Sequence, residues 1–532
     1  MRTKAKTKGK VAIVLSLALV GSMLLPIRIG TKTAQAAEVP TVREVNLNNN
    51  GTIPGITNPN QPGASTDAWS GSYVYLGKYW QDSDTNGDGK VDTSDEKSAI
   101  KWRVLSTEND SNGGNNPDSL LLMSDKVLDR VLFSEDGETS WEGSNIRKWL
   151  NSREYQDNPR YSYTSGGFLA TAFSPTEQAA IKSTTKPEGS SLDYTQEDEN
   201  ISFLSSALTG DKIFLPSAEE LDTAAYGFYH YGCCSYDGCI STAVAYTKFS
   251  DRLGVEYYLN QDLNVISTNY WLRSVCELRW SDEGTERRCG VCSKDYYFDC
   301  VSTDMPETSI GVAPALNLDT SSILFTSKSN VDKAKTFQRT GSGSNVDAWK
   351  LTLQDGEDFS ANRIEGETGS VSPGGTIHVK VTNVPTLTTG NAYTQISVML
   401  VDDTGTVMAY GKVADYDRET GITIEGSPVT ADVIPVEIPA DISEGEYTLK
   451  IFAEDVNSKG TDNAVDFASN MAELEVTIEN AIPQPKIQNV NFGVTGIQNP
   501  GQPDSIYEDW GGGSGNYVYF GSYWQKDTNG DG

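Results

Sequence analysis

The stretch from residue 84 to residue 95 reads DTNGDGKVDTSD and carries oxygen-bearing side chains at regular intervals. Calcium takes about six to eight oxygen ligands from carboxylates, amides and carbonyls, and a glycine permits the sharp turn between them. The spacing D-x-N-x-D-G therefore predicts a calcium loop, with a solvated acidic turn as the alternative. The predicted ligands are Asp84, Asn86, Asp88, the backbone carbonyl of Lys90, Asp92 through a water molecule, and Asp95.

The cysteines form a second group with reactive chemistry, because all seven lie between residues 233 and 300. In a protein outside the cell such a group indicates disulfides, here with one thiol left over. The alternative is a redox or zinc pair in CGVC, but no second C-x-x-C at zinc-finger spacing accompanies it. The disulfide candidates are Cys233, Cys234, Cys239, Cys276, Cys289, Cys292 and Cys300.

The segments around the cysteines, YHYGCCSYDGC and CELRWSDEGTERRCGVCSKDYYFDC, are dense in aromatic and charged residues. Tyrosine, tryptophan and arginine are the usual anchors of binding surfaces. These segments are either loops held by disulfides with no further role, or a ligand-binding face. The candidate binding residues are Tyr236, Trp280, Tyr296 and Tyr297.

Histidine is almost absent from the chain, which has His230 beside the cysteines and His378 far from them. We expect His378 to be exposed, since in TIHVKV it alternates with Ile377 and Val379. Two separate histidines argue against a Ser-His-Asp or Cys-His centre, and no phosphate-binding glycine motif is present. We therefore predict no catalytic residues and no enzyme.

The N-terminus has the pattern of a secretory signal peptide over residues 1–36, with lysines before a short apolar run and AQAA at its end. The alternative is an uncleaved membrane anchor. Removing these seven basic residues changes the net charge from -31 to -38, which disfavours nucleic acid as a partner. We expect a secreted protein, extracellular or associated with the cell wall. It would meet a membrane only through the signal peptide or a C-terminal anchor.

The predicted secondary structure around these residues follows two different sequence patterns, one in each half of the chain. Residues 37–68 are predicted as a linker and residues 69–327 as an α+β domain, with strands at YVYLGKYW, IKWRVL and SLLLMSD and short helices at SNIRKWLN, SPTE and SAEE. After a linker at 328–346, residues 347–482 alternate apolar and polar side chains in six segments. That alternation predicts an all-β immunoglobulin-like sandwich.

The opening of the first domain then recurs at the end of the chain. GSYVYLGKYWQ matches GNYVYFGSYWQ at 515–525, and DTNGDG follows in both copies. We expect residues 483–532 to be a linker and the truncated start of a second copy, in a chain that continues beyond Gly532.

The acidic loop resembles those of dockerins, the modules that attach enzymes to cellulosomes. Dockerins pair two loop–helix units, whereas a strand-like SAIKWRVL follows here. The loop is therefore predicted as a calcium clip in the connection between two strands.

From Tyr73 to Ser327 the motifs YVYLGKYWQ, IKWRVL, LLLMSDKVLD, AFSPTE, DKIFLPSAEEL, YWLRS and GVAPALNLD resemble an uncharacterised domain family of secreted and surface proteins of Gram-positive bacteria. The domain is also similar to the formylglycine-generating-enzyme branch of the C-type lectin fold, although Ala313 stands where that branch has arginine.

The lectin-like resemblance implies two functions of different classes. The first is adhesion or ligand recognition, with the loops between Cys276 and Cys300 binding an extracellular glycan or protein. The second is an oxidative enzyme, which needs a cysteine pair that has no match at a definite position here. A structural surface spacer is the remaining alternative. We favour recognition because repeated copies raise avidity without new contacts.

Overall fold

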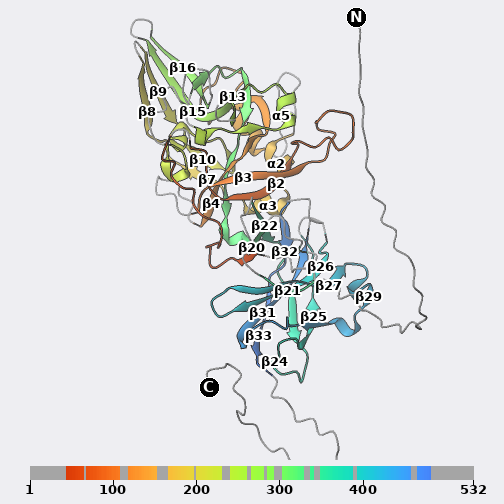
Figure 1. Ribbon diagram of the computed structural model, residues 1–532. Helices are drawn as coiled ribbons and strands as arrows, with labels where there is room; N and C mark the ends of the chain where they lie inside the picture. Colours follow the sequence, from red (N-terminus) through yellow and green to blue (C-terminus); the bar gives the residue numbers. More distant parts are fainter. Residues whose placement is uncertain are drawn as a thin grey trace, which may run out of the picture. The chain divides into compact units, whose positions relative to one another are not determined.

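The computed structural model describes two β-rich regions between residues 44 and 480 (Figure 1). The predicted signal peptide and the second copy at 483–532 lie outside the described residues. The described residues are 44–64, 67–107, 118–152, 166–196, 199–229, 240–260, 265–280, 284–292, 302–328, 333, 336–340, 348–387, 392–456 and 464–480.

An antiparallel sheet in the order β11–β19–β4–β3–β2 forms the centre of the first domain. All six residues of β4 are buried, which explains the unbroken apolar run LLLM. The predicted strands YVYLGKYW, IKWRVL and SLLLMSD are confirmed as β2, β3 and β4. The strands are β2 (Tyr73–Tyr79), β3 (Ser98–Ser106), β4 (Ser119–Ser124), β11 (Ile213–Phe214) and β19 (Ala315–Asp319).

A second sheet of the first domain has the order β17–β16–β15–β18–β6, with β9 on the other side of part of β15 and β8 beside β9. Its strands are β6 (Asp129–Leu132), β8 (Ser191–Gln196), β9 (Glu199–Ser205), β15 (Tyr270–Trp280), β16 (Gly284–Cys292), β17 (Ser302–Asp304) and β18 (Ser309–Val312). Short pairs complete the domain: β5 (Lys126–Val127) with β12 (Ala245–Tyr246), β7 (Thr184–Lys186) with β10 (Leu208–Asp211), and β13 (Tyr257–Asn260) with β14 (Val265–Thr268).

The helices of this domain are short and depend on capping residues. Ser144 caps α1, and its buried face of Ile146, Trp149 and Leu150 confirms the predicted helix. The predicted capping boxes are also confirmed, with Ser174 opening α3 and Ser217 opening α4. The α-helices are α1 (Asn145–Asn151), α2 (Phe168–Ala172), α3 (Pro175–Ala180), α4 (Ala218–Leu221) and α5 (Lys248–Arg252).

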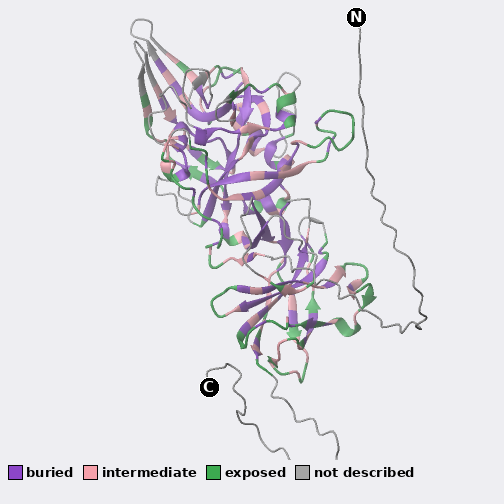
Figure 2. Ribbon diagram, viewed as in Figure 1, coloured by how far each residue is buried: buried purple, intermediate pink, exposed green. Residues whose placement is uncertain are grey.

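Large aromatic side chains fill the core of the first domain, where the strands are coloured as buried in Figure 2. Fully burying one such side chain contributes about 1.5–3 kcal/mol, so this group dominates the stability of the domain. These buried aromatic residues include Trp102, Trp141, Trp149, Trp271, Phe133 and Phe168.

Two sheets make up the second domain, and all six predicted strand segments are confirmed. Alternating residues of β25, such as Ile377 and Val379, are buried, while His378 between them is half-exposed. One sheet contains β24 (Ser370–Val371), β33 (Ala472–Ile478), β31 (Gly445–Asp455), β26 (Gln395–Asp402), β27 (Val407–Asp417), β28 (Gly421–Ile424), β29 (Ser427–Pro428) and β21 (Gln338–Arg339). The other contains β23 (Ser360–Arg363), β25 (Thr376–Asn383) and β30 (Val433–Glu437).

Strand pairing joins the two domains, so both predicted linkers need correction. Strand β1 (Val45–Leu47), in the predicted linker 37–68, pairs with β20 (Ile323–Lys328). Strand β22 (Trp349–Gln354) pairs with β20 and β2 of the first domain and with β32 (Asp466–Ala468) of the second. These pairings connect residues far apart in the chain, and local composition carries no signal for them.

The burial of Lys333 is also at odds with the linker predicted at 328–346, since a linker residue is expected to be exposed. Its ammonium group is fully buried, 2.7 Å from both Glu454 Oε1 and Asp466 Oδ2. Lys350 adds a second cation, 2.8 Å from Asp466 Oδ1. These four side chains are called the buried ion cluster below.

The described chain is mostly β and is built of more than one domain. The helices expected of an α+β first domain are present but short. Among the residues described, no helix is long and apolar enough to cross a membrane.

Candidate functional site

The acidic loop connects β2 to β3, whose ends pair with each other at Tyr79 and Ser98. Its position between two paired strands is as predicted, and strand β3 follows it in place of a dockerin-type helix. Figure 2 shows the loop as an exposed turn at the side of the first domain. Buried Val91 is the loop's contact with the apolar core.

The first half of the loop is held by hydrogen bonds from backbone amides to side-chain oxygens. The carboxylate of Asp84 accepts bonds from Gly87 N at 2.7 Å and Gly89 N at 2.8 Å. Gly89 has a φ of 84°, which other residues adopt only with strain. Asn86 and Asp88 accept bonds from the amides two residues further on.

The second half of the loop is closed by Asp95, whose carboxylate is buried. One oxygen accepts bonds from Thr85 N at 2.7 Å and Asn86 N at 3.2 Å, and the other accepts one from Asp92 N at 2.8 Å. The Asp92 amide, followed by those of Thr85 and Asn86, holds the pKa of Asp95 below its ordinary value. Asp95 therefore ties the two ends of the loop together.

The loop offers only oxygen donors, and this donor chemistry suits a hard cation such as Ca²⁺. In the conformation described, these oxygens accept hydrogen bonds from the loop's own amides, and Asp92 also pairs with Arg252 at 2.8 Å. No group of three acidic, histidine or cysteine side chains within the described ranges is arranged to hold a metal. The Asp95 carboxylate, one of the predicted ligands, is engaged in closing the loop.

The described part of the second predicted cysteine segment, residues 276–280 and 284–292, belongs to an antiparallel hairpin of β15 and β16. Cys276 and Cys289 are buried free thiols, which corrects the disulfide prediction at these two positions. Cys276 lies opposite Arg288 and Cys289 opposite Val275, so their side chains point to opposite faces of the sheet. Burial raises the pKa of Cys276 to about 12, and it also raises that of Cys289.

The CGVC motif lies in strand β16, which ends at Cys292. Residues three apart in a strand face opposite sides of a sheet, so Cys289 and Cys292 do not present a shared metal or redox site. The other four disulfide candidates, Cys233, Cys234, Cys239 and Cys300, lie outside the described residues.

The candidate ligand face is described only in part. Tyr236, Tyr296 and Tyr297, together with His230, lie outside the described residues. Trp280 is the last residue of β15 and is paired with Glu199 of β9 and Gly284 of β16. Strands, and not loops, therefore position Trp280.

Comparison with known proteins finds a match for one part of the chain. Residues 117–320 match a domain of unknown function, DUF6273. The DUF6273 region begins just before β4 and ends at β19, so it contains the β15–β16 hairpin but not the acidic loop. No curated protein matches the chain, and no solved structure matches it.

The DUF6273 region contains a buried ionic group that was not predicted from the sequence. Arg273 of β15 forms two bonds to the carboxylate of Glu220 in α4, at 2.6 and 2.7 Å. Lys186 of β7 lies 3.0 Å from the same carboxylate. The signal for this group was present in the motifs YWLRS and SAEEL, which contain Arg273 and Glu220. Their joint role is to tie three elements together.

Proposed function

We propose that this protein is a secreted or cell-wall-associated recognition protein that binds an extracellular glycan or protein ligand. The proposal treats the first domain as C-type-lectin-like and the second as an immunoglobulin-like support. The observation that carries it is the set of strands β8, β9, β15 and β16, which run side by side to one end of the first domain (Figure 1). Trp280 is the last residue of β15.

The chemistry of this hairpin end suits recognition. Tryptophan presents a large flat apolar surface on which a sugar ring or an apolar side chain packs. Arg287 of β16 is two-thirds exposed and pairs with Glu277 of β15 at 2.8 Å, which adds polar groups to the same hairpin. Since the chain has a net charge of -31, its ligands should be neutral or cationic.

The binding prediction is tested with the full chain on an array of glycans and mucins. Wild type should bind at least one class of probe, and Trp280→Ala should reduce its affinity by about 2 kcal/mol, or about thirtyfold, as expected for loss of an aromatic anchor. Tyr416→Ala, at a half-exposed aromatic position on β27, is the matched control and should bind like wild type. Blank arrays, or equal binding by Trp280→Ala, would contradict the proposal.

Calcium is proposed as a stabilising ion of the acidic loop, held by Asp84, Asn86, Asp88 and the carbonyl of Lys90, with Asp92 and Asp95 completing or closing the loop. Its charge would neutralise a concentration of acids that otherwise repel one another. The proposal rests on the oxygen-only donor set and on the loop's place between two paired strands.

Removing calcium should therefore destabilise the first domain. With calcium about a hundredfold above its dissociation constant, wild type should gain about 2.7 kcal/mol relative to EDTA, measured by thermal unfolding. Asp84→Ala should show no response to EDTA. Asp417→Ala is the control, because Asp417 accepts amide bonds in an ordinary turn of the second domain and should leave the response intact. Equal melting of wild type with and without EDTA would refute calcium binding.

A structural spacer is the second candidate function, and one observation favours it. The pairing of β22 with β2, β20 and β32 joins the two domains through backbone hydrogen bonds. The oxidative alternative gains no support from Cys276 and Cys289, because burial keeps both thiols protonated and a thiol attacks as its thiolate.

A further inference from the structure

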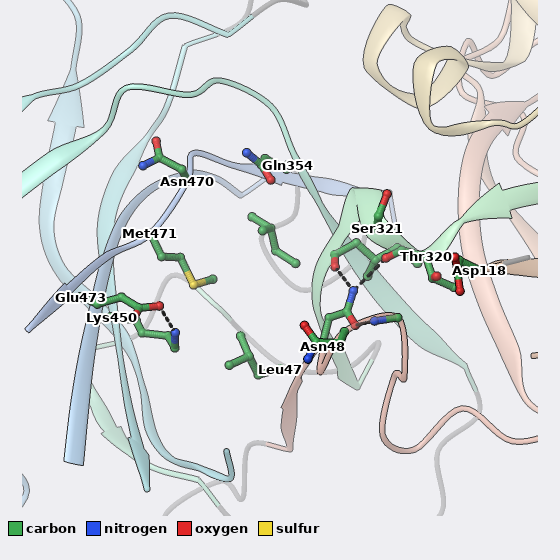
Figure 3. A pocket seen from close by; sticks show the side chains of 14 residues that line it. Leu47, Asn48, Asp118, Thr320, Ser321, Gln354, Lys450, Asn470, Met471 and Glu473 are labelled. Atoms are coloured by element: carbon green, nitrogen blue, oxygen red, sulfur yellow. Dashed lines mark hydrogen bonds and ion pairs between the residues drawn. The ribbon is translucent and has the colours of Figure 1, made fainter. Parts of the chain in front are cut away.

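A cleft of about 540 Å³ lies between the end of the first domain and the second domain (Figure 3). One wall comes from β1, the turn after it and the start of β20, and the other from β22, β31 and β33. The volume falls within the range of about 300–1,000 Å³ that is usual for small-molecule sites. The cleft is separate from both the acidic loop and the β15–β16 hairpin.

The wall from the first domain contains a buried hydroxyl without a hydrogen-bond partner, on Thr320, and an exposed carboxylate, on Asp118. Thr320 is 1% exposed, yet its hydroxyl has no hydrogen-bond partner. Gly51 has a φ of 87°, and a Cβ atom there would lie 3.3 Å from Thr320 Oγ1 and 4.0 Å from Asp118 Oδ1. The glycine thus leaves a space in front of this hydroxyl and this carboxylate.

The backbone around that space is held in place before any ligand binds. Asn48 Nδ2 donates to the carbonyl oxygens of Thr320 at 2.8 Å and Ile323 at 2.6 Å, and Asn48 Oδ1 accepts a bond from Gly51 N at 2.9 Å. One side chain therefore fixes both sides of the space. Such preorganisation lowers the entropy cost of binding.

The wall from the second domain is polar but carries no net charge. Lys450 forms an ion pair with Glu473, as Figure 3 shows, and Gln354 adds an amide that both donates and accepts. Leu47 and Met471 contribute apolar surface between the polar groups. Asp118 takes part in no ion pair within the part of the chain that is described.

These groups select a particular ligand chemistry. An anion would meet the Asp118 carboxylate, and the lysine among the described residues of the cleft, Lys450, is already paired with Glu473. A wholly apolar molecule would leave the Thr320 hydroxyl without a partner, which is costly for a buried polar group. A sugar has hydroxyl groups that donate to a carboxylate and bond to a hydroxyl or an amide, and C–H faces that pack on aliphatic side chains.

We propose that the cleft is a binding site for a short neutral saccharide, with hydroxyl groups of the sugar bonded to Thr320 and Asp118 and its C–H face on Leu47 and Met471. This site is independent of the hairpin end that contains Trp280. The protein would then hold a ligand at the junction of its two domains as well as at the end of the first.

The test is saturation-transfer NMR on the full chain with glucose, galactose, mannose, N-acetylglucosamine, lactose and cellobiose, followed by calorimetric titration of the strongest. Thr320→Val keeps the shape of the side chain and removes only the hydroxyl. It should weaken binding about fivefold while leaving the melting temperature unchanged or higher, because the hydroxyl it removes is unsatisfied. Asp118→Asn should weaken binding similarly, and asparagine tolerates the positive φ of 58° at this position.

Thr326→Val is the matched control, since Thr326 carries another buried hydroxyl without a partner but does not line the cleft. It should bind the sugar like wild type. The proposal is overturned if no sugar of the panel binds at about 10 mM, or if Thr320→Val binds as tightly as Thr326→Val. Binding of glucosamine without any neutral sugar would also overturn it, because it would make Asp118 a site for amines.

Discussion

Replacing Glu220 by glutamine is expected to lower the free energy of unfolding by about 3–5 kcal/mol, the usual cost of breaking a buried ion pair from one side. Glu220 is 5% exposed and its carboxylate faces two cations, Arg273 and Lys186. It also accepts the Ser217 amide at 2.9 Å, which closes the capping box of α4. The amide of glutamine would remove the negative charge that Arg273 and Lys186 both face.

The pH dependence gives this prediction a second test. Arg273, followed by Lys186, holds the pKa of Glu220 far below the ordinary value of about 4.3, against the opposing effect of burial. A lowered pKa in the folded state stabilises the protein above the unfolded-state pKa, and this stabilisation is lost as the pH falls below it. The difference between wild type and Glu220→Gln should thus be constant above about pH 5 and shrink below about pH 4.

Denaturant unfolding followed by tryptophan fluorescence measures both effects. Glu219→Gln is the control, because Glu219 is the next residue of the same helix but is only partly buried. It should change stability by less than about 0.5 kcal/mol. A loss for Glu220→Gln no larger than that of Glu219→Gln would show that the buried pair contributes nothing beyond a surface charge.

Elements decided by local chemistry could be predicted from the sequence. Ser174 and Ser217 each stand three residues before a glutamate, and the capping box forms wherever that spacing meets a helix start. The alternation of Ile377, His378 and Val379 predicts a strand buried on one face, because successive side chains of a strand point to opposite sides. The strand-like runs YVYLGKYW and IKWRVL on either side of the acidic loop likewise predict that it connects two strands.

Features that depend on distant partners could not be predicted. The segment Cys276–Cys292 resembles a loop in sequence because charged residues interrupt its apolar ones, whereas in the structure its strands pair with each other and with β9. Nothing near Asp95 shows that its carboxylate would meet the amide of Thr85, since this contact depends on how the loop closes. The cleft likewise combines residues from both ends of the described chain.

Lys333 is the clearest case, because it lies in a polar stretch, SKSNVDKAKTF, that has the composition of a linker. A charged lysine is buried only where acidic side chains pair with it. The acids that pair with Lys333 are Glu454 and Asp466, which lie more than a hundred residues further along the chain. The structure thus assigns Lys333 to the second domain's interior, where Thr352 also accepts a bond from it at 2.6 Å.

Replacing Lys333 by methionine is therefore expected to cost about 3–5 kcal/mol, although methionine matches the lysine stem in shape. The buried ion cluster contains two lysines and two acids, and the substitution removes one of its two positive charges. Coulomb attraction from Asp466, then Glu454, outweighs burial and raises the pKa of Lys333, so the charge being removed is present at neutral pH.

A surface ion pair of the same domain provides the contrast. Lys412 pairs with Asp415 at 2.7 Å but is partly exposed, so Lys412→Met should cost only about 0–1 kcal/mol. Restoring neutrality should also recover stability. With Lys333→Met in place, the further change Glu454→Gln should cost less than it does alone, because the Glu454 carboxylate has then already lost its ion pair with Lys333. Calorimetric unfolding of the four variants measures this coupling, and strictly additive costs would mean that Lys333 stabilises the domain by packing and not by its charge.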